Sequence, residues 1–327
     1  MSNDIAFLAE FADGEASRSA LELAAGAAEL AESSRGTAVA LAYGPGAKAG
    51  AAGLGAAGAA RAVVLGDAEA PAITFAAAAA AAVKELQPLA VLAPAAPNGR
   101  DLAAALVGLL ELPAFGPVRS VSVDGGKVRS EQATLQGTVI TLSEPTDEAP
   151  QPAVVLVLAN TFTPREGGSA TAQVSDAPAA DAGAFGKART VESHPAEAAV
   201  ANLEEASVII AGGRGVGSEE GFKPLHDLAD ALGGAVGASR AAADAGWVPY
   251  QLQIGQTGKI VKPALYMGIG ISGAIQHRVG MQTAESVVAI NKDPDAPIGE
   301  FADLFVVGDL FAIVPKLTDE IRRRKGR

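Results

Sequence analysis

One sequence pattern recurs along the carboxyl-terminal part of this chain of 327 residues: a short apolar segment that ends in a polar or glycine-rich turn. Short apolar segments bounded by turn residues predict β-strands. The segments that carry this pattern are 207–211, 234–238, 264–267, 286–290 and 304–307. Ligands of an open parallel sheet bind outside the carboxyl ends of its strands, because loops and helix N-termini converge there. The pattern therefore predicts a doubly wound parallel sheet with one binding crevice at that edge.

Polar side chains follow these segments directly. Arg214 follows the first segment, and Ser239 and Arg240 follow the second. Asn291 follows the fourth segment, and Asp309 follows the fifth. Two arginines at the carboxyl edge of one sheet favour contact with an anion or a planar ring over simple solvation, because the planar guanidinium suits both.

The turn at 268–273 fits the motif G-x-G-x-x-G and lies between a predicted strand and a predicted helix. Such glycines let backbone amides approach a pyrophosphate, and the helix N-terminus adds a favourable dipole. By itself the motif is a weak signal in a chain with 38 glycines. It is strengthened by a second glycine-rich turn at 212–217, and by Asn291 and Asp293 at the position expected for a ribose-binding residue, about 20 residues further on.

Longer segments resemble the electron transfer flavoprotein alpha subunit family. They occur in the family's order and are 239–247 (SRAAADAGW), 256–259 (QTGK), 270–277 (GISGAIQH), 289–297 (AINKDPDAP) and 308–311 (GDLF). The resemblance implies an α/β chain of two domains. The first, over 1–195, is a nucleotide-hydrolase-like α/β domain that pairs with a partner subunit. The second, over 196–327, is a doubly wound parallel-sheet FAD-binding domain.

The resemblance also implies a function. The chain is expected to be the alpha subunit of a heterodimer with the electron transfer flavoprotein beta subunit, and to bind FAD. It would take electrons from flavin dehydrogenases, such as the acyl-CoA dehydrogenases of fatty acid β-oxidation. It would pass them one at a time to a quinone-reducing or other acceptor oxidoreductase. The flavin carries the chemistry in such a protein, so no catalytic acid or base is expected.

Individual residues take roles from the resemblance. Arg240 is expected beside the isoalloxazine ring, with Arg214 near it. Thr257 is expected to hydrogen-bond flavin N5, and Gln256 to touch the ring system. His277 is expected at the N1/C2 carbonyl edge, where a fixed donor or cation stabilises the negative charge of the reduced ring.

The remaining residues of the implied site contact the rest of the cofactor. Ribityl, phosphate and adenosine contacts are assigned to Ser239, Ser272, Gln276, Asn291 and Asp309. The cofactor site is completed by Ile254, Gly255, Gly273, Ala274, Ile275 and Leu310.

The residue types leave other interpretations open. The hydroxyl of Thr257 equally suits a turn that satisfies its own backbone. His277 also suits a structural donor whose proton affinity is lowered by the N-terminus of its helix. Capping or turn roles suit Ser239, Ser272, Gln276, Asn291 and Asp309 as well.

Composition excludes several classes of function. A formal net charge of -12 disfavours nucleic acid and anionic membrane surfaces as partners. The absence of cysteine excludes disulfides, thiolate nucleophiles, cysteine-ligated clusters and a cysteinyl flavin. The histidines are far apart in sequence and show no metal-ligand spacing; they are His194, His226 and His277.

Targeting and membrane signals are weak in this sequence. Residues 1–10 lack the basic start of a secretion signal. The alanine-rich tract 75–95 is interrupted by Lys84, Glu85 and Pro88, which argues against a membrane span. We therefore expect a soluble, cytoplasmic protein without direct membrane insertion, whose short basic tail at 322–327 caps the last helix.

The N-terminal part alternates predicted strands and helices, which argues for a parallel sheet between helices. Strands are predicted at 5–9, 38–43, 62–65 and 89–93. Helices are predicted at 17–33, 72–86 and 100–111, the last preceded by a turn and cap at 97–101. Beyond Pro117, strands joined by short turns are predicted at 119–123, 127–131, 138–142 and 153–158.

The tract 167–200 has few large apolar residues and is expected to be an irregular connection. One strand is predicted near 190–192, and the domain boundary is placed near Pro195.

Other functions stay open on the residues. The glycine motif also suits an NAD-dependent dehydrogenase, which would be colourless, or a nucleotide-binding regulatory subunit without redox turnover. Within the family, the alternative is an electron-bifurcating member that also uses NADH.

Overall fold

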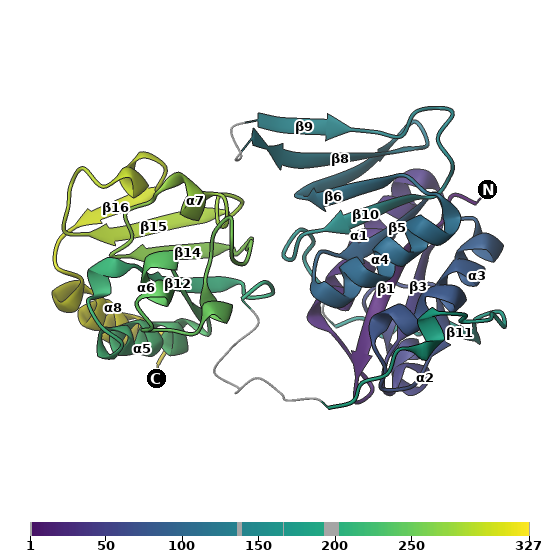
Figure 1. Cartoon of the computed structure of the whole chain (residues 1–327), viewed down its shortest axis with the longest axis horizontal. Helices are drawn as coiled ribbons and strands as arrows, with labels where there is room; N and C mark the ends of the chain where they lie inside the picture. The colour runs from purple at the N-terminus through teal and green to yellow at the C-terminus, as the bar shows by residue number, and fades with distance from the viewer. Residues whose placement is uncertain (1, 136–138, 166, 193–202, 327) are drawn as a thin grey trace. The chain divides into compact units, whose positions relative to one another are not determined.

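A computed structural model of the chain shows two compact units, Met1–Ser193 and His194–Arg327 (Figure 1). It describes residues 2–135, 139–165, 167–192 and 203–326. The boundary predicted near Pro195, and Thr138 of one predicted strand, lie outside the described residues. Both units are α/β, and each has its own parallel sheet, as the sequence predicts.

The C-terminal unit is built on a five-stranded sheet. Its strands are β12 (Val208–Gly212), β13 (Ala235–Ala238), β14 (Leu265–Ile269), β15 (Ser286–Asn291) and β16 (Leu304–Val307). Their order is β13-β12-β14-β15-β16, and every neighbouring pair is parallel. The strand order reverses between β12 and β14, and such a switch point leaves a crevice at the carboxyl ends of the strands.

Helices and short 3-10 segments connect these strands. The α-helices are α5 (Lys223–Leu232), α6 (Arg240–Asp244), α7 (Ile275–Arg278) and α8 (Leu310–Arg324). The 3-10 segments are η5 (Arg214–Val216), η6 (Glu220–Phe222), η7 (Tyr250–Leu252) and η8 (Pro297–Glu300). α5 and α8 pack against each other, and Leu225, Leu228 and Val314 are completely buried in the core.

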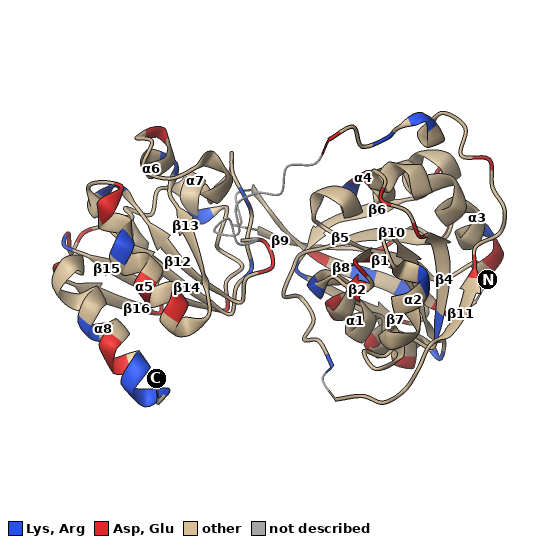
Figure 2. Ribbon diagram, turned by 90° about the horizontal axis from the view of Figure 1, so that it is seen from below, with Lys and Arg blue, Asp and Glu red and all other residues tan. Residues whose placement is uncertain are grey.

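The basic end of α8 has two roles (Figure 2). Arg322, Arg323 and Arg324 form its last turn, where cations stabilise the helix dipole, as predicted. The next residue, Lys325, caps the C-terminal end of α5. Its Nζ donates to the backbone carbonyls of Ala231 at 3.0 Å and Leu232 at 3.3 Å. The tail therefore closes the end of α5 as well as that of its own helix.

The N-terminal unit has an eight-stranded sheet in the order β11-β4-β3-β1-β5-β10-β6, with β2 paired to β1. The pairs along this path are parallel, and the short β2 is antiparallel. The strands are β1 (Ile5–Ala12), β2 (Glu15–Ala16), β3 (Ala38–Tyr43), β4 (Arg61–Gly66), β5 (Ala90–Pro94), β6 (Ala114–Val118), β10 (Ala153–Val157) and β11 (Gln173–Asp176).

Helices cover both faces of this sheet because its central strands are apolar on both sides. Successive residues of a strand point to opposite faces. Ile5 and Phe7 of β1 belong to the core cluster that contains Leu23 of α1, and Leu8 belongs to the cluster that contains Leu102 of α4. The helical segments are α1 (Arg18–Ser34), α2 (Ala47–Gly50), η1 (Ala51–Gly55), η2 (Ala72–Phe75), α3 (Ala76–Leu86), α4 (Pro97–Leu110) and η4 (Phe185–Lys187). Across the described ranges of both units, no helix has the length and apolar character needed to cross a membrane.

A second, antiparallel sheet follows β6. It consists of β7 (Ser120–Asp124), β8 (Lys127–Thr134) and β9 (Val139–Ser143), which confirms the predicted strands. Gly125 and Gly126 join β7 to β8 with φ of 57° and 78°, as a two-residue hairpin turn of this kind requires.

Several predictions for the N-terminal unit need correction. No strand forms at 190–192, although these residues are described. β11 forms instead and pairs with β4; all of its residues are exposed, so no apolar pattern marks it in the sequence. α4 begins at Pro97 and not at Arg100, because a proline at the first helical position lacks only an N–H that has no intrahelical partner. β6 was also not predicted from the sequence; it contains Pro117, which is tolerated because β6 lies at the edge of the sheet.

Candidate functional site

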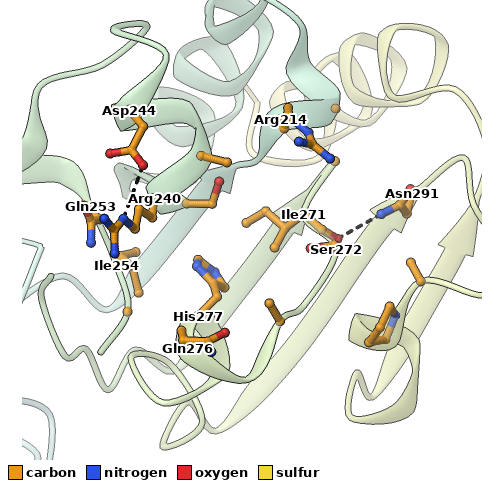
Figure 3. Close-up of a pocket in the computed structure, with 18 of the residues that line it drawn as sticks. Arg214, Arg240, Asp244, Gln253, Ile254, Ile271, Ser272, Gln276, His277 and Asn291 are labelled. Atoms are coloured by element: carbon orange, nitrogen blue, oxygen red, sulfur yellow. Dashed lines mark hydrogen bonds and ion pairs between the residues drawn. The ribbon is translucent and has the colours of Figure 1, made fainter. Parts of the chain in front are cut away.

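A pocket of about 850 Å³ lies outside the carboxyl ends of four strands of the C-terminal unit (Figure 3). Its walls are the turns after β12, β13, β14 and β15, together with the loop that holds Gln253 to Thr257. Ligand pockets in proteins typically have volumes of about 300–1,000 Å³. The pocket therefore has the size and the position expected of a cofactor site in a sheet of this topology.

Most of the predicted site residues line this pocket. They are Arg214, Ser239, Arg240, Ile254, Gly255, Gln256, Thr257, Ser272, Ala274, Gln276, His277 and Asn291. These residues come from separate turns, and the parallel sheet brings them together because all its strands end at the same edge.

Gly273, Ile275, Asp309 and Leu310 do not line the pocket. Gly273 has φ of +84°, and a Cβ there would stand 2.4 Å from the backbone nitrogen of Ile298. Ile275 is 58% exposed, and Leu310 is buried in the core. The carboxylate of Asp309 caps α8 by accepting from the backbone N–H of its second residue at 2.9 Å. Ligand contacts by these four residues stay predictions.

Sequence reasoning missed Asp244, Gln253 and Lys292, which also line the pocket. Asp244 has a signal in the sequence, since it follows Arg240 by four residues, the spacing of ion pairs on a helix. Gln253 has no such signal, because it lies in an irregular loop far from the glycine-rich turns.

Arg240 and Arg214 contribute the positive charge from the first two turns of the pocket. Arg240 Nε donates to Asp244 Oδ2 at 3.3 Å, as Figure 3 shows, and Tyr250 donates to the other carboxylate oxygen at 3.1 Å. The carboxylate beside it raises the pKa of Tyr250. Arg214 is exposed and has no ion-pair partner within the described residues, so its charge is available to an anion.

The loop that follows η7 rests against α7. The backbone N–H of Gln256 donates to the carbonyl of Gln276 at 2.7 Å. A Cβ on Gly255 would lie 2.9 Å from the same carbonyl oxygen, so the close approach depends on glycine. Gln253 is 5% exposed, and its Nε2 donates to the hydroxyl oxygen of Thr257 at 2.9 Å. Since that oxygen already accepts a hydrogen bond, the proton of the Thr257 hydroxyl can point elsewhere, including into the pocket.

The glycine-rich turns after β12 and β14 touch each other. A Cβ on Gly213 would lie 2.3 Å from the carbonyl oxygen of Gly270, whose own φ is +63°. These glycines therefore allow the two turns to pack closely against each other, and they would also allow a ligand to approach the backbone. The helix that follows, α7, has only four residues, so the expected helix dipole is that of a single turn.

Asn291 organises the same edge of the sheet. Its Nδ2 donates to the carbonyl of Ile271 at 2.9 Å, and its Oδ1 accepts from the backbone N–H of Asp293 at 3.1 Å. The amide therefore holds the glycine-rich turn and the turn after β15 together.

His277 lies on α7 and is 7% exposed, and its imidazole projects into the pocket in Figure 3. Its Nε2 lies 2.6 Å from the hydroxyl of Tyr266, which is completely buried in β14. Burial lowers the pKa of His277 to about 4, and the backbone of Ile254 acts in the opposite direction. The imidazole is therefore neutral at pH 7, and burial is the main cause; a contribution from the N-terminus of its helix stays a prediction.

Two polar atoms of the pocket are buried without a hydrogen-bond partner in the described part of the chain. They are the hydroxyl oxygen of Ser239 and Nδ1 of His277. Buried polar atoms are nearly always hydrogen-bonded, so both are candidates for contact with a ligand. The described residues contain no group of three or more His, Asp or Glu side chains that could hold a metal ion.

The sequence is similar to proteins of one known family. Residues 5–182 match the family described as electron transfer flavoprotein domain, and residues 202–282 match the electron transfer flavoprotein FAD-binding domain. The electron transfer flavoprotein subunit alpha of Syntrophomonas wolfei subsp. wolfei is 40% identical over 242 residues, which are 74% of this chain and 75% of that protein. The chain belongs to the electron transfer flavoprotein alpha subunit family.

Other relatives in this electron transfer flavoprotein family match a shorter region at higher identity. The subunit alpha of Mycobacterium leprae is 62% identical over 125 residues, which are 38% of this chain and 39% of the relative. The mitochondrial subunit alpha of Dictyostelium discoideum is 60% identical over 123 residues, 38% of this chain and 35% of that protein. These matches span well under half of the relatives' length.

Proposed function

We propose that the pocket outside β12 to β15 binds FAD, and that the chain is the flavin-carrying subunit of a two-subunit electron carrier. The observation that carries the proposal is a pair of buried polar atoms, Ser239 Oγ and His277 Nδ1, that lack hydrogen-bond partners among the described residues and lie in a pocket at the switch point of the sheet. A flavin nucleotide offers carbonyl, ring-nitrogen, hydroxyl and phosphate acceptors that would satisfy such donors. The match of residues 202–282 to a FAD-binding domain supports the same ligand.

Different residues of the pocket would contact different parts of the ligand. Arg240, Gln256, Thr257 and His277 would hold the isoalloxazine ring. Thr257 would donate to flavin N5, because its oxygen already accepts from Gln253. Arg214, Ser239, Ser272, Gln276 and Asn291 would hold the ribityl, phosphate and adenosine groups. The bound flavin would supply the redox chemistry, and the protein would set its potential and its access to partners.

The partners of the chain are part of the proposal. The chain would pair with an electron transfer flavoprotein beta subunit, as the name of its relatives suggests. It would accept electrons from flavin dehydrogenases such as acyl-CoA dehydrogenases and deliver them one at a time to an acceptor oxidoreductase. The assembly would work in the cytoplasm without inserting into a membrane.

Purification of the full chain with its partner subunit tests the proposal. We expect a yellow complex with a flavin absorption spectrum and one equivalent of FAD bound to this chain. A colourless complex that does not take up added FAD would overturn the proposal, and binding of NADH in its place would favour a nicotinamide-dependent dehydrogenase. Oxidation of NADH by a yellow complex, coupled to two different acceptors, would identify a bifurcating member.

A further inference from the structure

The contact between Tyr266 and His277 decides which ring nitrogen of the histidine carries its proton. Tyr266 is completely buried, and its hydroxyl lies 2.6 Å from His277 Nε2. Within the described residues, this nitrogen is the hydroxyl's one hydrogen-bond partner. A neutral imidazole has one N–H donor and one acceptor nitrogen, so the partner at Nε2 selects the tautomer.

Both groups of the pair are neutral at physiological pH. Burial raises the pKa of Tyr266 above its ordinary value, so the phenol keeps its proton. Burial also lowers the pKa of His277 to about 4, so the ring carries one proton and not two. One proton therefore lies between Tyr266 and Nε2, and it belongs to one of the two partners.

The proton can be assigned because a buried hydrogen-bond donor needs an acceptor. If Nε2 carried a proton and donated to Tyr266, the phenol's own O–H would have no acceptor in the described surroundings, which is costly in a completely buried group. If the phenol donates to Nε2, every donor at this contact is used, and the ring proton moves to Nδ1. Nδ1 belongs to a residue that lines the pocket, and it is buried without a hydrogen-bond partner of good geometry in the described part of the chain. The backbone of Ile254, which raises the pKa of the ring, is the protein group that competes with a ligand for the proton on Nδ1.

We propose that Tyr266 is a positioning residue that fixes His277 as a neutral donor, with its proton on Nδ1, toward an acceptor on the ligand in the pocket. The inference deepens the proposed function, on which it rests only for the identity of that acceptor, a carbonyl or ring-nitrogen edge of flavin. A neutral donor stabilises negative charge on the ligand without adding a full positive charge to the site. Tyr266 would act through the histidine and not through contact with the ligand.

The ring nitrogens of His277 report the tautomer directly by ¹⁵N nuclear magnetic resonance of the full-length, ¹⁵N-histidine-labelled chain. The chain contains three histidines, so loss of signals in His277→Gln assigns the resonances. We expect Nδ1 to be protonated and Nε2 unprotonated at pH 7. A proton on Nε2, or on both nitrogens, would overturn the proposal, and this measurement on the unaltered chain needs no variant to fold.

Tyr266→Phe tests the role of the hydroxyl itself. We expect the preference for Nδ1–H to be lost, with a shift of the ring resonances toward the other tautomer. Tyr43→Phe is the matched control, because Tyr43 is a buried tyrosine of the N-terminal unit whose hydroxyl, unlike that of Tyr266, has no hydrogen-bond partner in the described residues. A folded Tyr266→Phe chain whose tautomer is unchanged would contradict the proposal.

The flavin-loaded complex gives a second readout. Tyr266→Phe is expected to weaken FAD binding several-fold and to lower the midpoint potential, while Tyr43→Phe changes neither. If Tyr266→Phe shifts the tautomer but leaves both flavin properties unchanged, Nδ1 does not donate to the ligand and that part of the proposal fails. If the unaltered complex binds no FAD, the proposed function fails, and the tautomer measurement still tests the assignment of the proton.

Discussion

Arg240 and Asp244 lie one turn apart on α6 and form an ion pair at the edge of the pocket, with 3.3 Å between Nε and Oδ2. Their side chains are 67% and 48% exposed, and Tyr250 holds the second oxygen of the carboxylate. The guanidinium therefore faces the pocket with part of its charge already compensated by a neighbour and by water. This arrangement limits how strongly Arg240 can tune a ligand in the pocket.

Arg240→Ala is expected to lower the midpoint potential of bound flavin, because a cation favours the more negative, reduced ring. Two unit charges 4 Å apart attract by about 1 kcal/mol in water and about 4 kcal/mol at an effective dielectric of 20. A change of roughly 1.4 kcal/mol corresponds to about 59 mV for a one-electron step. Because Arg240 is exposed and paired, we expect a shift of about 40 mV, near the lower limit.

Two further variants sharpen this prediction. Asp244→Asn should raise the potential, since it frees the charge of Arg240, and Arg240→Lys should give a value between those of Arg240→Ala and the unaltered chain. Spectroelectrochemical titration of the assembled complex measures all of them. An unchanged potential in Arg240→Ala with FAD still bound would place the guanidinium away from the flavin.

Gly273→Ala is expected to destabilise the C-terminal unit and to reduce FAD binding as a consequence. The φ of +84° disfavours any side chain, and the added Cβ would stand 2.4 Å from the backbone nitrogen of Ile298. Left-handed strain costs about 1–2 kcal/mol, and the steric clash adds to it. Gly217→Ala is the control, because φ is +86° there but no atom of the described residues lies within 4 Å of the new Cβ.

Scanning calorimetry of the two glycine variants measures the unfolding transition of each unit. We expect the transition of the C-terminal unit to fall further in Gly273→Ala than in Gly217→Ala, with the transition of the N-terminal unit unchanged. Equal effects of the two substitutions would show that the contact with Ile298 is not limiting.

Asp309→Ala separates a structural role from a ligand role for this residue. Its carboxylate caps α8 through the backbone N–H of Phe311 at 2.9 Å, so the loss of the cap should cost about 1 kcal/mol of stability. Asp309 does not line the pocket, so the cap alone predicts an unchanged dissociation constant of FAD, whereas the ligand contact implied by the resemblance predicts weaker binding. Asp309→Asn should retain most of the stability. A tenfold loss of FAD affinity in a stable Asp309→Asn protein would establish a ligand contact.

The buried His277 makes the stability of the flavin-free chain depend on pH. Its pKa is about 4 in the folded chain and 6.5 in a model peptide, so between these values the unfolded state binds more protons. Stability contributed by this group is fully present above pH 6.5 and falls as the pH decreases toward 4, by about 3 kcal/mol at most.

Chemical unfolding of the C-terminal unit at several pH values between 4 and 7 checks this dependence. His277→Gln should remove most of the slope. His226→Gln should retain it, because His226 is an exposed residue of α5. A slope that survives in His277→Gln would assign the pH dependence to other groups.

The elements of the fold were largely predictable where local chemistry decides the structure. The five strands of the C-terminal sheet follow from short apolar segments, and their polar ends follow from the turns that terminate them. β11 was not predictable, because an exposed edge strand buries no side chains and so carries no apolar pattern. The predicted start of α4 was wrong because the sequence carries a misleading signal there. Pro97 and Gly99 suggest a turn, although both lie inside the helix.

The sequence by itself determined the family, the parallel sheets and most of the residues that line the pocket, because these depend on local patterns and on the common edge at which parallel strands end. Only the tertiary structure decided how those side chains are engaged. It pairs Arg240 with Asp244, places Gln253 behind Thr257, and buries Tyr266 against His277. Hydrogen-bond partners and burial depend on packing between segments distant in sequence, so the protonation of His277 follows from the fold and not from the motif that contains it.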